Sequence, residues 1–124
     1  MNEPLLRKTA NAIAANPEYL DMNDYVGRYN GRTTACIAGL VLFTHEKQTD
    51  LTRFYNKYRD RFPVDETRKL LGLNDVEFGE LTIIQLWLES DAKTAYLNAQ
   101  TPEEQALAAA EYIRWFVKTG GGTK

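Results

Sequence analysis

The chain contains one cysteine and one histidine among 124 residues, and its only serine is Ser90. A single cysteine, Cys36, cannot form a disulfide within the chain, so nothing indicates an oxidising compartment. Cys36 and His45 would lie about 13 Å apart along one helix, which is too far for a thiol-imidazole pair. Ser90 lacks the Gly-x-Ser-x-Gly pattern of serine hydrolases. We therefore interpret Cys36 as a small core residue and Ser90 as a helix cap.

Metal and phosphate motifs are also incomplete. His45 and the glutamate after it start a His-Glu-x-x-His zinc motif, but residue 49 is threonine. Asp21 and Asn23 match the first ligands of a calcium loop, whereas Arg32 stands where the bidentate glutamate is needed. The glycines of "TGGGTK" are followed by no helix that could bind a phosphate. We predict no cofactor and no metal site.

Long hydrophobic runs are absent as well. The longest, residues 35–43, is about half of the roughly 20 residues that cross a bilayer. The first residues contain no apolar core of a secretory signal. The net charge of -2 provides no general attraction to nucleic acid or anionic membranes. These features predict a cytoplasmic protein without membrane contacts, folded as one domain over 1–124 with a flexible tail at about 119–124.

What is present is helical spacing and capping, which predict an all-α fold. Asn30-Gly31 favours a tight turn, and a small hairpin around it is an alternative to irregular structure. The architecture expected is a compact single-domain bundle of five to seven short helices at mixed angles. The first predicted helices cover about 3–15, from Thr33 or Thr34 to 46, and 51–62 after a cap at Asp50. Three further helical segments are "VDETRKLLGL" closed by Gly72, a segment capped by Asn74 and Glu77, and "LTIIQLWL". The last two predicted helices cover 91–99 and 102–118.

Two apolar segments matter for packing. The segment around Cys36 is apolar on nearly all sides, which predicts burial from several directions. Gly39 inside it would let another helix approach closely. The segment "LTIIQLWL" fits either a helix or a buried strand, and we predict a helix with Leu81, Ile84 and Leu88 on one face.

Several short motifs resemble a family of small uncharacterised proteins from bacteria and bacteriophages. In that family the segment reads Cys-Gly-Thr-x-x-Cys-Ile-Ala-Gly followed by an aromatic residue. The matching residues here are Thr33, Cys36, Ile37, Ala38 and Gly39, and further shared traits are Leu71 to Leu73 with Glu77 and Leu81, Trp87, and an alanine-rich last helix.

The departures from the family pattern are informative. Gly31 and Arg32 replace the first Cys-Gly, and Leu40 replaces the aromatic residue. A disulfide or metal pair that needs both cysteines therefore cannot form within this chain. The resemblance implies structural roles for Thr33, Cys36 and Gly39, and it implies no activity.

The basic residues Arg53, Lys57 and Arg61 are spaced by four and predict one exposed stripe on the helix of 51–62. Residues 32–62 contain six basic and three acidic residues, whereas residues 63–124 contain six basic and ten acidic ones. The stripe is a candidate site for nucleic acid or an anionic ligand. The overall charge argues against nucleic acid.

With no complete catalytic motif, the leading hypothesis is a non-enzymatic helical module that acts through protein-protein contacts, with an accessory protein or as a homo-oligomer. Trp87 and Trp115 would be interface anchors if exposed, although core packing is the simpler interpretation. The alternatives are anion binding at Arg53, Lys57 and Arg61, and a small hydrolase that uses carboxylates. The hydrolase would need a deep pocket lined by at least two of them.

Overall fold

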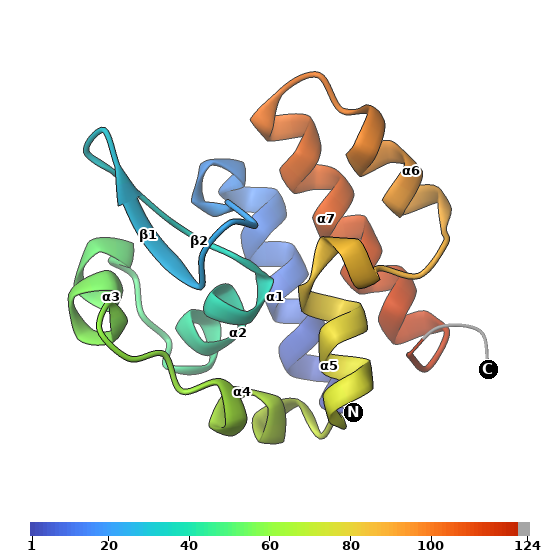
Figure 1. Ribbon diagram of the computed structural model, residues 1–124, viewed down its shortest axis with the longest axis horizontal. Coiled ribbons are helices and arrows are strands. Elements are labelled where there is room, and N and C mark those ends of the chain that lie inside the picture. Colours follow the sequence, from blue (N-terminus) through green and yellow to red (C-terminus); the bar gives the residue numbers. More distant parts are fainter. Residues whose placement is uncertain (122–124) are drawn as a thin grey trace.

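The computed structural model describes residues 1–121, which form seven α-helices, two short 3-10 helices and one two-stranded sheet (Figure 1). The predicted all-α class is therefore corrected to mainly helical with one hairpin. The elements in chain order are α1 (Glu3–Ala15), η1 (Pro17–Tyr19), β1 (Val26–Tyr29), β2 (Arg32–Ala35), α2 (Ile37–His45), α3 (Leu51–Tyr58), α4 (Val64–Leu71), α5 (Asp75–Thr82), η2 (Ile84–Leu86), α6 (Asp91–Asn98) and α7 (Pro102–Lys118).

The hairpin of β1 and β2 forms at the Asn30-Gly31 turn. Both turn residues have positive φ, 52° at Asn30 and 77° at Gly31, as a two-residue hairpin turn requires. The strands are antiparallel and pair Val26 with Ala35. The predicted helix start at Thr33 or Thr34 is wrong, because strand pairing holds both residues in β2. Cys36 caps α2 instead.

Helix α2 is the centre of the core. Every residue from Ala35 to Phe43 is buried. Gly39 is required by a close approach, since a Cβ atom there would lie 1.9 Å from the backbone oxygen of Tyr25. The neighbour that approaches is thus the loop before β1, not another helix as expected.

Helices α1 and α7 match their predicted bounds and lie side by side through the middle of the molecule (Figure 1). Thr101 caps α7 by accepting a hydrogen bond from the Glu104 N–H, and Pro102 occupies the first helical position. The buried face of α7 includes Ala106, Ile113 and Phe116. Local capping and apolar spacing agree at both helices, which explains the success of the prediction.

Two helices end earlier than predicted. Helix α3 ends at Tyr58, and the chain then turns so that the Phe62 ring stacks on Tyr25 at 4.5 Å. Phe62 precedes proline and is thereby disfavoured in a helix. Helix α5 ends at Thr82, so the predicted helix through "LTIIQLWL" is wrong: η2 and extended residues follow.

The end of α7 is closed by residues of the predicted tail. The Gly121 N–H donates a hydrogen bond to the Phe116 carbonyl at 2.8 Å, and Gly121 is buried. The rest of that predicted tail, 122–124, lies outside the described residues. Over residues 1–121, no helix combines the length and apolar character needed to span a membrane.

Candidate contact surface

The structure places Cys36 in the core, with 5% of its surface exposed. Burial raises the pKa of its thiol to about 11, against the opposing effect of the Gly39 and Ala38 N–H groups. A reactive cysteine needs the opposite shift. His45 is exposed at the far end of α2, so the only thiol and the only imidazole do not meet.

The other motif residues have packing contacts. The Thr33 hydroxyl lies 3.0 Å from the Thr52 hydroxyl and joins β2 to the first turn of α3. Gly39 accommodates the loop before β1, as described above. The structural roles that the resemblance implies for Thr33, Cys36 and Gly39 stay a prediction.

The predicted basic stripe is only partly assembled. Arg53 and Lys57 are exposed on α3, but Arg61 lies beyond the end of that helix. Lys57 Nζ forms an ion pair with Glu46 Oε1 at 3.2 Å, and Glu46 also accepts a hydrogen bond from the Tyr58 hydroxyl. This pairing offsets part of the positive charge, which weakens the stripe as an anion site. Binding by Arg53, Lys57 and Arg61 stays a prediction.

Carboxylates gather along a groove between α6 and α7, where a pocket of about 820 Å³ is lined by Glu89, Asp91, Glu104 and Glu111. The Glu89 and Glu111 side chains are 88% and 62% exposed and pair with Lys93 and Arg114. A general acid needs a desolvated carboxyl group. The groove therefore favours solvated ion pairs over acid-base catalysis.

The two tryptophans differ in burial. Trp87 is 3% exposed and belongs to the core, which confirms the simpler interpretation for that residue. Trp115 is half-buried on α7, and its side chain lines two surface grooves. Neither ring forms an exposed anchor.

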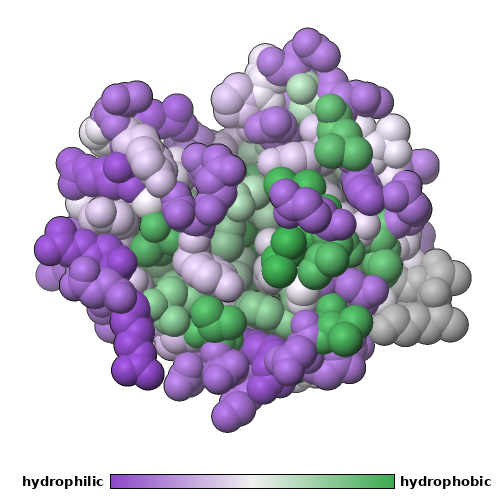
Figure 2. All heavy atoms as spheres, in the orientation of Figure 1, coloured by the Kyte–Doolittle hydropathy of each residue, from purple (hydrophilic) through white to green (hydrophobic). Residues whose placement is uncertain are grey.

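A different apolar surface lies on α5 and η2. Val76, Ile83 and Leu86 are 67%, 45% and 51% exposed. Val76 and Ile83 are seven residues apart and share one side of the helix, with Gly79 between them. Leu86 folds back over Gly79, and its Cδ1 atom lies 3.1 Å from the position of an added Cβ. We call Val76, Ile83 and Leu86 the α5–η2 face; Figure 2 shows hydrophobic residues gathered over these two elements.

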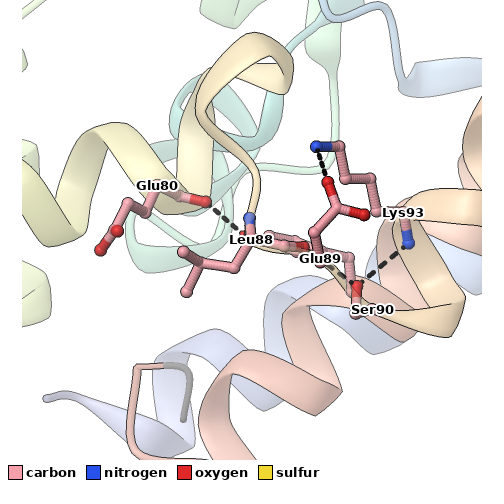
Figure 3. Close-up of polar contacts among 6 residues, drawn as sticks. Glu80, Leu88, Glu89, Ser90 and Lys93 are labelled. Carbon is pink, nitrogen blue, oxygen red and sulfur yellow. Dashed lines mark hydrogen bonds and ion pairs between the residues drawn. The ribbon is translucent and has the colours of Figure 1, made fainter. Parts of the chain in front are cut away.

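Buried hydrogen bonds hold the backbone beneath the α5–η2 face. The Trp87 indole N–H donates to the Leu81 carbonyl at 3.0 Å. The Tyr112 hydroxyl donates to the Glu80 carbonyl at 2.5 Å and accepts from the Leu88 N–H at 2.9 Å. Figure 3 shows Glu80 and Leu88 brought together at this point. These bonds occupy carbonyl groups in the last turn of α5, which explains why the helix stops there.

Ring stacking completes this support. The Trp87 and Tyr112 rings stack with centroids 4.1 Å apart and planes 9° apart. Burial raises the pKa of Tyr112 to about 12, which keeps its hydroxyl protonated further into the alkaline range than an exposed tyrosine. The α5–η2 face therefore rests on a fixed backbone rather than on a loose loop.

The surroundings of the α5–η2 face are acidic. Residues 70–92 contain five acidic residues and no lysine or arginine. Asp75 forms an ion pair with Arg68 at 3.1 Å, and Glu89 forms one with Lys93 at 2.8 Å. An apolar strip within a negative segment is thus presented to solvent.

The sequence pattern did not predict this surface, because the predicted helix accounted only for the buried side of "LTIIQLWL". Placing Leu81, Ile84 and Leu88 inward leaves Ile83 and Leu86 on the outside of the same helix. Apolar residues on both sides of a short segment were the available signal. That signal predicts either burial on both sides or an exposed contact surface.

Comparison of the chain with protein-family models, with curated proteins and with solved structures finds no match. The resemblance to small bacterial and bacteriophage proteins stays a prediction. Among residues 1–121, no group of three or more His, Cys, Asp or Glu side chains is arranged to hold a metal ion. Within residues 1–121 the protein is mainly helical, and its exposed large apolar residues include those of the α5–η2 face.

Proposed function

We propose that the protein is a non-enzymatic module that binds a basic, amphipathic helical segment of a partner protein on the α5–η2 face. The observation that carries the proposal is the exposure of Val76, Ile83 and Leu86 on and beside α5 and η2. Contiguous exposed apolar residues with a polar rim are typical of contact surfaces. An apolar helix side fits such a strip by inserting residues at helical spacing.

Charge selects the kind of partner. After Asp75 and Glu89 are paired, Glu77 and Asp91 still contribute negative charge to the same segment. A second copy docked through this face would bring two acidic segments together, which costs energy. A segment with lysine or arginine beside its apolar residues would gain from the same charges. The proposal therefore names a basic partner and not a homo-oligomer.

A defined peptide tests the proposal directly. The probe is a helical peptide with a leucine side and a lysine side, titrated into ¹⁵N-labelled protein and followed by amide shifts. We expect shifts centred on Val76, Ile83 and Leu86. The double substitution Ile83→Asp with Leu86→Asp should weaken binding by at least about tenfold, because it removes apolar contact and adds like charge.

Matched controls distinguish binding at this face from nonspecific hydrophobic binding. Leu97 and Leu107 are also exposed, on α6 and α7, so Leu97→Asp with Leu107→Asp should leave the affinity unchanged. A peptide with glutamate in place of lysine should bind at least about tenfold more weakly. Thermal melting should show both double variants folded. Shifts confined to the α6–α7 groove, or equal affinity for the two peptides, would refute the proposal.

The cytoplasmic location and the nature of the natural partner stay predictions. Neither alternative function gains a specific observation of its own. The basic stripe is divided by the end of α3, and the carboxylates of the α6–α7 groove are exposed.

A further inference from the structure

A second hollow lies between the hairpin and the helices α6 and α7. It appears as the notch at the top of Figure 2. Its volume is about 450 Å³, within the range of small-molecule sites. The walls come from the loop before β1, from the hairpin, and from η2, α6 and α7. We call it the hairpin cleft.

Two side chains of opposite charge line the hairpin cleft without pairing to each other. The Asp21 carboxylate accepts a hydrogen bond from the Asn23 N–H at 3.0 Å. The Arg32 guanidinium donates to the Glu18 carbonyl at 3.2 Å, at the rim. Within residues 1–121, neither Asp21 nor Arg32 belongs to an ion pair. Both groups keep capacity for a ligand.

The backbone sets the spacing of these charges. The Asp21 N–H donates to the Ala35 carbonyl at 3.0 Å, so Asp21 lies beside the end of β2. Arg32 is three residues back along that strand, about 10 Å away. Arg32 and Thr34 alternate onto one side of β2, and both line the cleft. The two charged side chains therefore approach the same space from separate points.

The rest of the lining is apolar and aromatic. Leu20, Met22 and Ile84 are partly buried and pack against the core. Tyr96 forms a wall from α6, and its ring lies 5.1 Å from Trp87 in an edge contact. Burial, and next the charge of Asp21, raise the pKa of Tyr96, which agrees with Asp21 and Tyr96 facing one space.

We propose that the hairpin cleft binds a small zwitterion, a free α-amino acid with an apolar side chain. Asp21 would accept the ammonium group, Arg32 would bind the carboxylate, and Leu20, Met22 and Ile84 would contact the side chain. A ligand with one charge only would form a charge-assisted contact with Asp21 or with Arg32, but not with both. This site is separate from the α5–η2 face, and its test is independent of the proposed function.

The first measurement uses ligands that differ by one charged group. Titration with L-leucine, followed by amide shifts and calorimetry, should locate binding at Asp21, Tyr96 and Arg32. Isoamylamine lacks the carboxylate, and isocaproate lacks the ammonium group. Each should bind at least about tenfold more weakly than leucine, since one charge-assisted contact is lost.

Substitutions then assign each charge to its partner. Asp21→Asn should reduce leucine binding by about tenfold and leave isocaproate binding unchanged. Arg32→Gln should also reduce leucine binding by about tenfold. It should leave isoamylamine binding unchanged. Arg28→Gln is the matched control, because Arg28 is an exposed arginine of the same hairpin outside the lining. Melting curves of the three variants should match the parent, since the substituted side chains are at least partly exposed.

Several results would overturn this proposal. They are no binding of leucine at millimolar concentration, equal binding of leucine and its single-charge analogues, an Arg28→Gln effect equal to that of Arg32→Gln, or preferential binding of an uncharged polyol such as glucose in the same cleft. The site would be established if leucine binds, if Asp21→Asn weakens leucine but not isocaproate, and if Arg32→Gln weakens leucine but not isoamylamine.

Discussion

The two apolar segments of this chain differ in burial. Residues 35–43 are buried without exception, on the end of β2 and in α2. Residues 81–88 are mixed, with Leu81 and Trp87 buried and Ile83 and Leu86 about half exposed. Apolar content alone therefore does not predict burial in this protein.

The difference comes from the neighbours of each segment. Helix α2 is covered by α1, α4, α5 and the hairpin, so all its sides meet protein. The η2 segment has support on one side only, from Trp87 and Tyr112. Its outer side is left as a surface, which is the basis of the proposed contact function.

The same substitution in both segments tests this difference in burial most directly. Ile37 is fully buried and Ile83 is 45% exposed. Ile37→Ala should lower the free energy of unfolding by about 4 kcal/mol, through lost burial and a cavity. Ile83→Ala should lower it by only about 0.5 kcal/mol. Urea unfolding of the two variants measures both values, and similar losses would mean that the two segments are equally packed.

Removing one hydroxyl tests the support under η2. Tyr112→Phe keeps the stacked ring but leaves the Leu88 N–H and the Glu80 carbonyl without this partner. The expected loss is about 2 to 3 kcal/mol, with faster amide exchange at Leu88. Tyr25→Phe is the control, because the Tyr25 ring stacks on Phe62 at the partly exposed edge of the hairpin. Equal losses for the two variants would contradict a special role of Tyr112.

The pH dependence from Cys36 is a smaller effect than the losses expected for Ile37→Ala and Tyr112→Phe. Its thiol loses a proton at about 9.0 when exposed and at about 11 in the folded protein. Above pH 9 the unfolded chain therefore releases the proton first, and stability falls as pH rises. The contribution is about 1.4 kcal/mol at pH 10.

The variant Cys36→Ala isolates that contribution from the tyrosines, which also titrate at alkaline pH. The difference in unfolding free energy between the parent and Cys36→Ala should shrink by this amount between pH 7 and pH 10. Urea unfolding at the two pH values measures it. Parallel pH profiles would mean that the thiol is accessible in the folded state.

Local sequence signals predicted much of the fold. The predicted caps Asp50, Ser90 and Thr101 are found at α3, α6 and α7, and each cap is a contact within three residues. The Asn74 and Glu77 capping box of α5 is confirmed on both sides. Such signals depend on residues close in sequence, which explains why a reading of the chain alone could find them.

Local sequence patterns were enough to predict where most helices begin and that Cys36 lies in the core, and they contain no complete catalytic motif. Tertiary structure alone decided that Thr33 and Thr34 pair in a strand, that α5 stops at Thr82, and that Ile83 and Leu86 face solvent. Each of those outcomes depends on contacts between distant parts of the chain, such as the Tyr112 hydroxyl on Glu80, 32 residues away. Periodicity describes which side chains share a face, whereas only the packed neighbours decide which face is covered.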